Sequence, residues 1–332
     1  MTQTDTTESQ DRVHTPGDDR RWRESFYFSF YDPALGLGGF NSIGKRPASG
    51  HSGSFNVLWG PQAESLVGIE YDSFTEFDSD YAAGGLVYDA PVPFGPWRVS
   101  FSGPMNRGGL GVECDHAALA SAQGADDTVE VTYDLLFTPT HDPYVYRERS
   151  EWAELFTGHI DEICTVTGTL TIDGVTHAVD GHGSKDHSWG VRNWFAPIDW
   201  RWVDIVSGSA PQLTLWRGEP AGASPILDGA VYGDAGLEPL TSYEEKVELE
   251  PGDRVKGLPR SIEASIEVEG ARHSFVGVVH RVVPVLFRRE VEGGEEISWN
   301  DRCLVECTFD DGRVGWANIE FKQVVDVPAA DD

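Results

Sequence analysis

The sequence predicts an all-β protein. Its 332 residues contain many short runs rich in aromatic and β-branched residues, each bounded by Gly, Pro or Asp, which is typical of strands joined by turns. Asp173-Gly174 and Asp310-Asp311-Gly312 stand between such runs and have the composition of hairpin turns. The first half shows no sustained period of 3.6 residues, so long amphipathic helices are not expected there.

The chain begins with a polar segment. Residues 1–20 are rich in Thr, Asp and Gln and offer little apolar surface to a core, which predicts a disordered tail. This segment lacks an apolar run of the length of a signal peptide, and no window of the chain approaches the roughly 18 apolar residues of a membrane-spanning helix. We therefore expect a cytoplasmic protein that does not insert into membranes.

The first half then supplies a series of strands. Asp32-Pro33, followed by several glycines, predicts a sharp turn after the first of them. The best helix candidate is the brief stretch Arg147–Phe156. The expected strands are Ser25–Tyr31, Phe55–Trp59, Leu66–Tyr71, Trp97–Phe101, Gly111–Cys114 and Thr128–Phe137.

The second half repeats this pattern of short strands, although the two halves show no internal repeat. Strands at short spacing favour barrels or sandwiches, and domains of roughly 100–200 residues favour two units. A boundary near Val179 gives domains at 21–178 and 179–326 and a short tail at 327–332. The expected strands are Asp199–Val206, Gln212–Arg217, Ile226–Tyr232, Tyr243–Leu249, Ser261–Val268, His273–Val285, Cys303–Phe309 and Val314–Val325.

The charge balance excludes some partners. With 55 acidic and 25 basic residues, the formal net charge is −30. Such a surface repels nucleic acids and anionic membranes. The acidic excess with few lysines also suits a salt-rich cytoplasm, where the Debye length falls to roughly 3 Å near 1 M salt. The alternative is an ordinary acidic protein.

One stretch carries the chemistry. Gly181–Trp194 contains two histidines, a carboxylate, two cations and two tryptophans among three glycines. These polar groups are costly to bury unless each finds a partner. Because the stretch leaves a hairpin strand, Asp186 and Ser188 should face one side of a sheet, and Lys185, His187 and Trp189 should face the other.

Asp186 and His187 are the candidate catalytic residues. A carboxylate near an imidazole orients the ring and shifts its pKa toward neutrality, which suits general acid-base chemistry. Since neighbours on a strand point apart, partners from other strands are expected, and Asp204 and Glu320 are the acids to check. In the alternative, Asp186 pairs with Arg192 to anchor a loop, and His187 donates to a backbone carbonyl.

A metal or cofactor is not expected. The His-x4-His spacing of His182 and His187 matches no standard zinc signature, even with Asp186 added. Cys303 and Cys307, four apart on a strand, would stand about 13 Å apart, too far for one zinc ion. The glycines fit no dinucleotide fingerprint, and no Gly-x-Ser-x-Gly elbow occurs. Cofactor-free chemistry or simple binding remains.

Tryptophans gather beside the polar stretch. The chain has 11 of them, and four fall between residues 189 and 202. Indole rings line pockets for apolar ligands, and their faces stabilise cations. The alternative is ordinary core packing. The residues expected to contact a ligand are His182, Trp189, Arg192, Trp194, Trp202, Asp204 and Glu320.

The central stretch resembles a known superfamily. Val179-Asp-Gly-His-Gly183, then Asp186-His-Ser-Trp-Gly-Val-Arg192 and Trp194, after the hairpin Thr167–Gly174, are similar to the signature of the double-lipocalin superfamily. That superfamily includes AttH-like proteins and carotenoid hydratases of the hydroxyneurosporene synthase type. Weaker similarity covers Phe26–Pro33 and Gly312–Glu320.

This resemblance implies two lipocalin-like antiparallel barrels or half-barrels, side by side, with a ligand cavity between or within them. In the hydratase relatives, an acid protonates an isoprenoid double bond and water captures the carbocation without a cofactor. Asp186 and His187 would then be the acid-base groups, with Trp189 and Trp202 as cavity walls. Ser184-Lys185 and Arg192 are more similar to uncharacterised members than to the hydratases.

We therefore expect a protein that binds a hydrophobic, isoprenoid or lipid-like small molecule. As an enzyme it would be a cofactor-independent hydratase, cyclase or isomerase. The alternative is a non-catalytic carrier in which the polar stretch is purely structural. The sequence predicts no oligomeric state.

Overall fold

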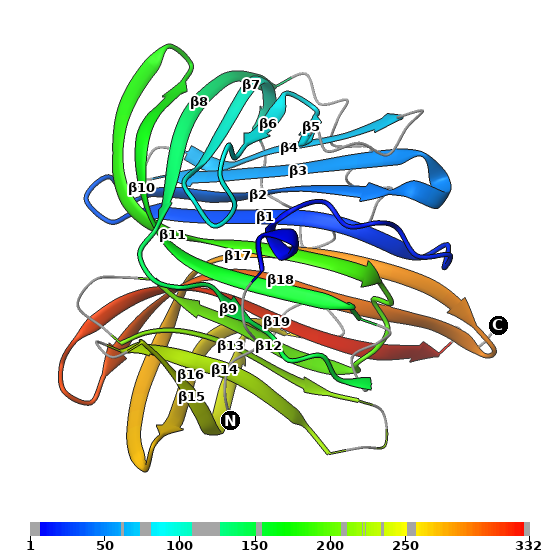
Figure 1. Cartoon of the computed structure of the whole chain (residues 1–332), viewed down its shortest axis with the longest axis vertical. Coiled ribbons are helices and arrows are strands. Elements are labelled where there is room, and N and C mark those ends of the chain that lie inside the picture. Colours follow the sequence, from blue (N-terminus) through cyan, green and yellow to red (C-terminus); the bar gives the residue numbers. More distant parts are fainter. Residues whose placement is uncertain are drawn as a thin grey trace. The chain divides into compact units, whose positions relative to one another are not determined.

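The computed structural model confirms an all-β protein (Figure 1). The helical elements given for the described residues are two 3-10 turns, η1 (Glu8–Asp11) and η2 (Pro47–Ser49). The structure describes residues 7–60, 63–73, 81–107, 127–150, 155–206, 211–220, 222, 224–233, 236–250 and 257–328.

The described chain forms two compact units that divide between Asn193 and Trp194. The first unit is an antiparallel sheet in the order β4-β3-β2-β1-β11-β10-β8-β7-β6-β5, with β9 paired to β10. Its strands are β1 (Trp22–Asp32), β2 (Leu37–Arg46), β3 (His51–Gly60), β4 (Ala63–Ser73), β5 (Tyr81–Ala83), β6 (Leu86–Asp89), β7 (Trp97–Arg107), β8 (Thr128–Pro139), β9 (Tyr144–Val145), β10 (Gly158–Ile172) and β11 (Val175–Val191).

This sheet curls around an aromatic core. A short additional pairing joins β4 to β7, with Leu66 opposite Arg107, so the sheet returns on itself. Alternate residues of β1, Phe26, Phe28 and Phe30, point into the core. Burying each Phe side chain contributes roughly 1.5–3 kcal/mol, and a slip of one residue would turn all three out of this core, so these residues fix the register of β1.

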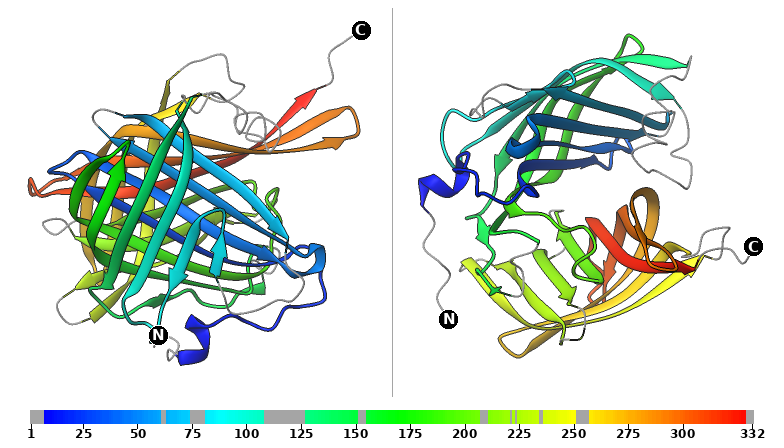
Figure 2. Two further views of the ribbon diagram at one scale, coloured as in Figure 1. Left: turned by 90° about the horizontal axis from the view of Figure 1, so that it is seen from above. Right: turned by 90° about the vertical axis from the view of Figure 1, so that its right-hand side faces the viewer.

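The second unit is a closed eight-stranded barrel (Figure 2). All its strand pairs are antiparallel, and β12 pairs with β19 to close the ring. Aliphatic and aromatic side chains such as Val203, Leu215 and Phe275 form its core. Its strands are β12 (Asp199–Ile205), β13 (Gln212–Glu219), β14 (Ile226–Gly233), β15 (Gly236–Glu250), β16 (Leu258–Val268), β17 (Ala271–Val291), β18 (Gly294–Phe309) and β19 (Val314–Pro328).

The division between the units lies later than the predicted boundary at 179. Strand β11 begins at Val175 and pairs along its length with β10 on one side, and over Val191 to His182 with β1 on the other. A strand held on both edges belongs to one sheet, so the polar stretch up to Val191 belongs to the first unit. The predicted ranges 21–178 and 179–326 are corrected accordingly.

Three local predictions also change. Within the predicted tail 1–20, residues 7–20 are described, and Asp11 is buried at 3% exposure, so this part is not excluded from the fold. At the other end, β19 continues to Pro328, beyond the predicted tail start at 327. The predicted helix at Arg147–Phe156 is absent from Arg147 to Arg149, while 151–154 lie outside the described residues, as does the predicted strand Gly111–Cys114.

In the part of the chain that the structure describes, helices are too short and too polar to span a bilayer.

Candidate functional site

Strand β11 presents two different faces, as its alternation predicts. His187 points into the first unit's core, where its ring stacks on Phe26 at a centroid distance of 3.9 Å. Lys185 points the same way, with its Nζ 4.8 Å from the centroid of the Trp97 ring. Asp186 points to the opposite face, where its Oδ2 lies 3.5 Å from His159 Nε2. Asp186 and His187 therefore do not form a pair.

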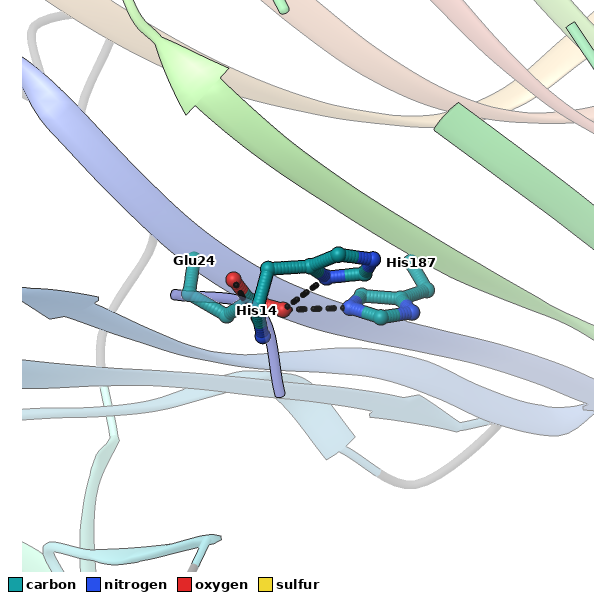
Figure 3. Close-up of side chains that lie close together, drawn as sticks. All are labelled: His14, Glu24 and His187. Carbon is teal, nitrogen blue, oxygen red and sulfur yellow. Dashed lines mark hydrogen bonds and ion pairs between the residues drawn. The ribbon is translucent and has the colours of Figure 1, made fainter. Parts of the chain in front are cut away.

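The partner of His187 is Glu24 of β1, which is fully buried (Figure 3). His187 Nε2 lies 2.7 Å from Glu24 Oε1, and His14 Nδ1 lies 3.0 Å from the same oxygen. The backbone N–H of His14 donates to Glu24 Oε2 at 3.3 Å. Glu24 shares the face of Phe26, so the register that buries the phenylalanines also places this carboxylate beside His187.

The charge states of this cluster follow from its contacts. Burial raises the pKa of Glu24, but hydrogen bonds from His14 and His187 outweigh burial and hold the pKa below its ordinary value. Burial lowers the pKa of His187 more than Glu24 raises it, so the ring is neutral at neutral pH. An ionised carboxylate only accepts, so Nε2 of His187 must carry the proton and Nδ1 must carry a lone pair.

Among the described residues, this lone pair has no hydrogen-bond partner, and Nδ1 is buried. A neutral imidazole with one nitrogen anchored to a carboxylate and the other free is the arrangement of a general base. His14 is the third residue of the cluster, and its ring stacks on that of Trp189 at a centroid distance of 3.7 Å.

A second buried cluster lies on the same face. Lys185 contacts both Asp11 and Glu162, and all three side chains are fully buried. Burial lowers the pKa of Lys185, but the two carboxylates outweigh it and raise the pKa, so the ammonium stays charged. Burial raises the pKa of Glu162 against the effect of Lys185. Glu162 Oε1 has no hydrogen-bond partner in the described ranges.

The opposite face of β10 and β11 holds a third cluster. His159 Nε2 lies 2.9 Å from Asp161 Oδ1, and the hydroxyl of Tyr146 donates to Asp161 Oδ2 at 2.6 Å. Burial lowers the pKa of His159, but Asp186 and Asp161 outweigh burial and raise the pKa to about 8. This imidazolium holds two neighbouring carboxylates together.

Two of these clusters have the donor atoms of a metal site. In each of them, one possible ligand atom per residue lies within 4.8 Å of the other two. The two groups are His14, Glu24 and His187, and His159, Asp161 and Asp186. Two histidines with one carboxylate suit zinc. In both groups a histidine nitrogen is already hydrogen-bonded to a carboxylate, which explains the close approach without an ion.

Three other predicted site residues, His182, Arg192 and Trp194, make their contacts away from His187. His182 is half-buried, and no described residue bonds its Nδ1. Arg192 donates through Nη2 to Ser188 Oγ at 2.8 Å. Trp194 belongs to the second unit, where it stacks on Phe287 at 4.5 Å. Of the predicted ligand-binding residues, Trp189 contacts the His187 cluster.

In the second unit, Trp202 lies opposite Glu320, and Asp204 accepts a hydrogen bond from Thr214 at 2.7 Å. Glu320 is engaged by Trp200 Nε1 at 3.0 Å and by Arg302 at 2.9 Å. These acids stand within the second unit, whereas the acids near His187 and His159 belong to the first. Their role in ligand binding stays a prediction.

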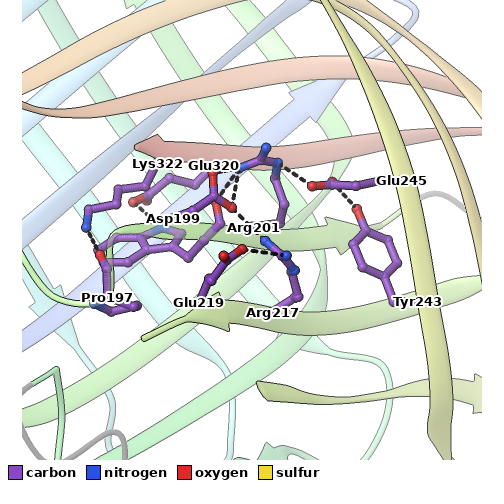
Figure 4. Close-up of polar contacts among 10 residues, drawn as sticks. Pro197, Asp199, Arg201, Arg217, Glu219, Tyr243, Glu245, Glu320 and Lys322 are labelled. Carbon is purple, nitrogen blue, oxygen red and sulfur yellow. Dashed lines mark hydrogen bonds and ion pairs between the residues drawn. The ribbon is translucent and has the colours of Figure 1, made fainter. Parts of the chain in front are cut away.

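The second unit also holds a network of paired charges (Figure 4). Arg201 contacts Glu245 at 3.0 Å and Asp199 at 3.4 Å, and Arg217 contacts Asp199 at 2.6 Å. Both arginines therefore have carboxylate partners, which suits bracing of the strands rather than proton transfer.

The sequence interpretation missed several residues of the site. Glu24 and Glu162 could have been found, because each is an acid at a position that alternation places on a core face, in line with Phe26 and with Cys164. Asp11 and His14 offered no such signal, since their segment is polar and has no periodicity. His159 and Asp161 belong to β10, where they lie opposite Ser188 and Asp186 of β11.

The curled antiparallel sheet and the closed antiparallel barrel together form a two-domain, lipocalin-like all-β fold. The chain belongs to the family described as Domain of unknown function (DUF7064), whose model matches residues 7–325. No curated protein matches the sequence.

Solved structures share the fold. An AttH-like protein of Nitrosomonas europaea matches with a TM-score of 0.62 at 12% identity, over 96% of each chain. Kievitone hydratase from Nectria haematococca matches with a TM-score of 0.54 at 13% identity, over 90% of this chain and 88% of the other. The protein CghA matches with a TM-score of 0.54 at 12% identity, over 94% of this chain and 90% of the other.

Proposed function

We propose that the first unit binds a hydrophobic, isoprenoid or lipid-like small molecule and acts on it by cofactor-independent acid-base chemistry, as a hydratase, cyclase or isomerase. The observation that carries this proposal is His187, a buried neutral imidazole that is anchored to Glu24 and keeps a free Nδ1 beside aromatic rings. The likeness to kievitone hydratase supports a fold compatible with this chemistry and does not identify a substrate.

The chemistry needs an acid as well as a base. Glu162 is the candidate acid, because burial raises its pKa above the ordinary value, although its contact with Lys185 opposes that rise. It pairs with Lys185 on β11, two residues from His187, and diagonal neighbours of this kind lie about 7–8 Å apart. That spacing would place both groups beside one bound molecule.

In a hydration, Glu162 would give its proton to one carbon of the double bond. Water would add to the other carbon, and His187 Nδ1 would take the proton that the water releases. The imidazolium formed would be stabilised by Glu24, and proton exchange would restore both groups. In an isomerisation or cyclisation, the same two groups would move a proton without adding water.

The test uses the molecule that the protein itself carries. Purified protein is extracted with organic solvent, and the extract is identified by mass spectrometry. The molecule is then returned to the protein in D₂O containing ¹⁸O-water. If the protein is an enzyme, the molecule should incorporate deuterium at carbon. If it is a hydratase, the molecule should also incorporate ¹⁸O.

The deciding variant is His187→Gln, whose amide can still donate to Glu24 but which lacks the free imidazole nitrogen. General acid-base groups contribute roughly 10²–10⁴-fold, so labelling should slow at least about a hundredfold while binding persists. His177→Gln, elsewhere on β11, is the matched control and should label normally. A bound molecule that neither the wild type nor the variant labels would favour the non-catalytic carrier.

A further inference from the structure

Asp11 is an unusual residue to find inside the first unit. It comes from the polar segment that precedes β1, and within η1 it alone is buried. Its Oδ1 contacts Lys185, and its Oδ2 accepts a hydrogen bond from the backbone N–H of Phe94 at 2.6 Å. A carboxylate from outside the sheet thus reaches a fully buried ammonium.

The surroundings of Lys185 suit an organic anion. The aromatic rings of Trp97, Phe94 and Phe26 lie 4.8, 5.8 and 6.0 Å from its Nζ. Rings provide an apolar lining, and the ammonium between them provides one strong point of attachment for a carboxylate. Apolar walls with a single fixed charge are typical of sites for amphipathic small molecules.

The two carboxylates on Lys185 are held differently. Glu162 belongs to β10, where it pairs with Lys185 of β11, and the residues before and after it pair with β9 and β8. Asp11 is held by its contacts with Lys185 and Phe94, on a segment whose neighbouring residues Glu8 and Ser9 are exposed. Of the two, Asp11 is the one that an incoming anion can replace without disturbing the sheet.

We infer that Asp11 occupies the place of the ligand's own anionic group, and that the site takes a hydrophobic molecule bearing a carboxylate, which pairs with Lys185 when Asp11 withdraws. This inference rests on the proposed function and narrows its ligand to an organic acid. The segment around Asp11 then acts as an internal competitor.

The experiment compares two fluorescent probes on the full chain. The probes are cis-parinaric acid and its methyl ester, which have the same polyene chain and differ in the charge of the headgroup. Asp11→Asn keeps an oxygen for the Phe94 N–H but removes the competing charge. Affinity should rise at least about tenfold for the acid, because its carboxylate no longer competes with that of Asp11 for Lys185, and should change little for the ester, which has no anion to pair with Lys185.

Two further variants complete the test. Glu8→Gln removes one negative charge from an exposed position of the same segment and should leave both affinities unchanged. Lys185→Met should abolish the preference for the acid over the ester. Circular dichroism confirms that each variant is folded, and Asp11→Asn decides the question if Lys185→Met does not fold.

Equal gains for the acid and the ester in Asp11→Asn, or no gain for either, would overturn the inference while leaving hydrophobic binding in the first unit intact. If neither probe bound to any of the folded proteins, the proposed binding function would fail together with the inference.

Discussion

Glu24 shows how a single acid organises this site. A fully buried carboxylate is costly in an apolar core, and without donors it would take up a proton. Three N–H groups, two of them from His14 and one from His187, keep it ionised instead. The same contacts fix the tautomer of His187, so the free nitrogen on the far side of the ring follows from the burial of Glu24.

His159 carries a pH-dependent prediction. Its pKa of about 8 in the folded protein exceeds the ordinary value of 6.5. A raised folded-state pKa gives stability that is complete below about pH 6.5 and is lost as the pH rises through about 8. The shift corresponds to about 2 kcal/mol. Urea unfolding of the wild type and His159→Gln, at about pH 6 and pH 9, measures this contribution.

The stability difference between wild type and His159→Gln should shrink by about 2 kcal/mol from the lower to the higher pH. His177→Gln, on the neighbouring strand, controls for the general loss of a histidine. A difference that stays constant over this range would show that Asp161 and Asp186 do not hold an imidazolium between them.

At the level of elements, turns and alternation were predictable because they are local. The Asp173-Gly174 hairpin joins β10 to β11 with φ values of 51° and 78°, the left-handed backbone that this pair of residues favours. Gly312 has φ 83° in the turn between β18 and β19. The two faces of β11 followed in the same way from alternation.

Features that depend on distant partners were not predictable. The predicted turn after Asp32 forms, with Gly36 at φ 62°, but Gly38 lies in β2, which begins at Leu37. A Cβ at Gly38 would lie 2.6 Å from the carbonyl oxygen of Phe30, so this glycine permits close approach of strands. The ion pair of Asp11 with Lys185 joins residues 174 positions apart, which no local pattern reports.

For the whole molecule, the net charge of −30 leads to a prediction about salt. On β15, Glu244, Glu248 and Glu250 are exposed, and such charges repel one another. We propose that the protein is adapted to high salt, which screens this repulsion. Dialysis from about 2 M to about 0.05 M KCl should reduce the β signal in circular dichroism, because the Debye length grows from a few to more than 10 Å.

A circular dichroism spectrum that does not change over that range would identify an ordinary acidic protein. The reverse dialysis, with recovery of the β signal, distinguishes loss of screening from irreversible aggregation.

The central claim is that His187, held by Glu24 inside the first unit, faces the ligand. A crystal structure of the protein with its co-purified molecule tests this most directly. We expect electron density among the aromatic side chains of the first unit, with a ligand atom or an intervening water about 3 Å from His187 Nδ1. Density confined to the second unit, or to the Asp186 face of β11, with His187 Nδ1 packed against protein alone, would contradict it.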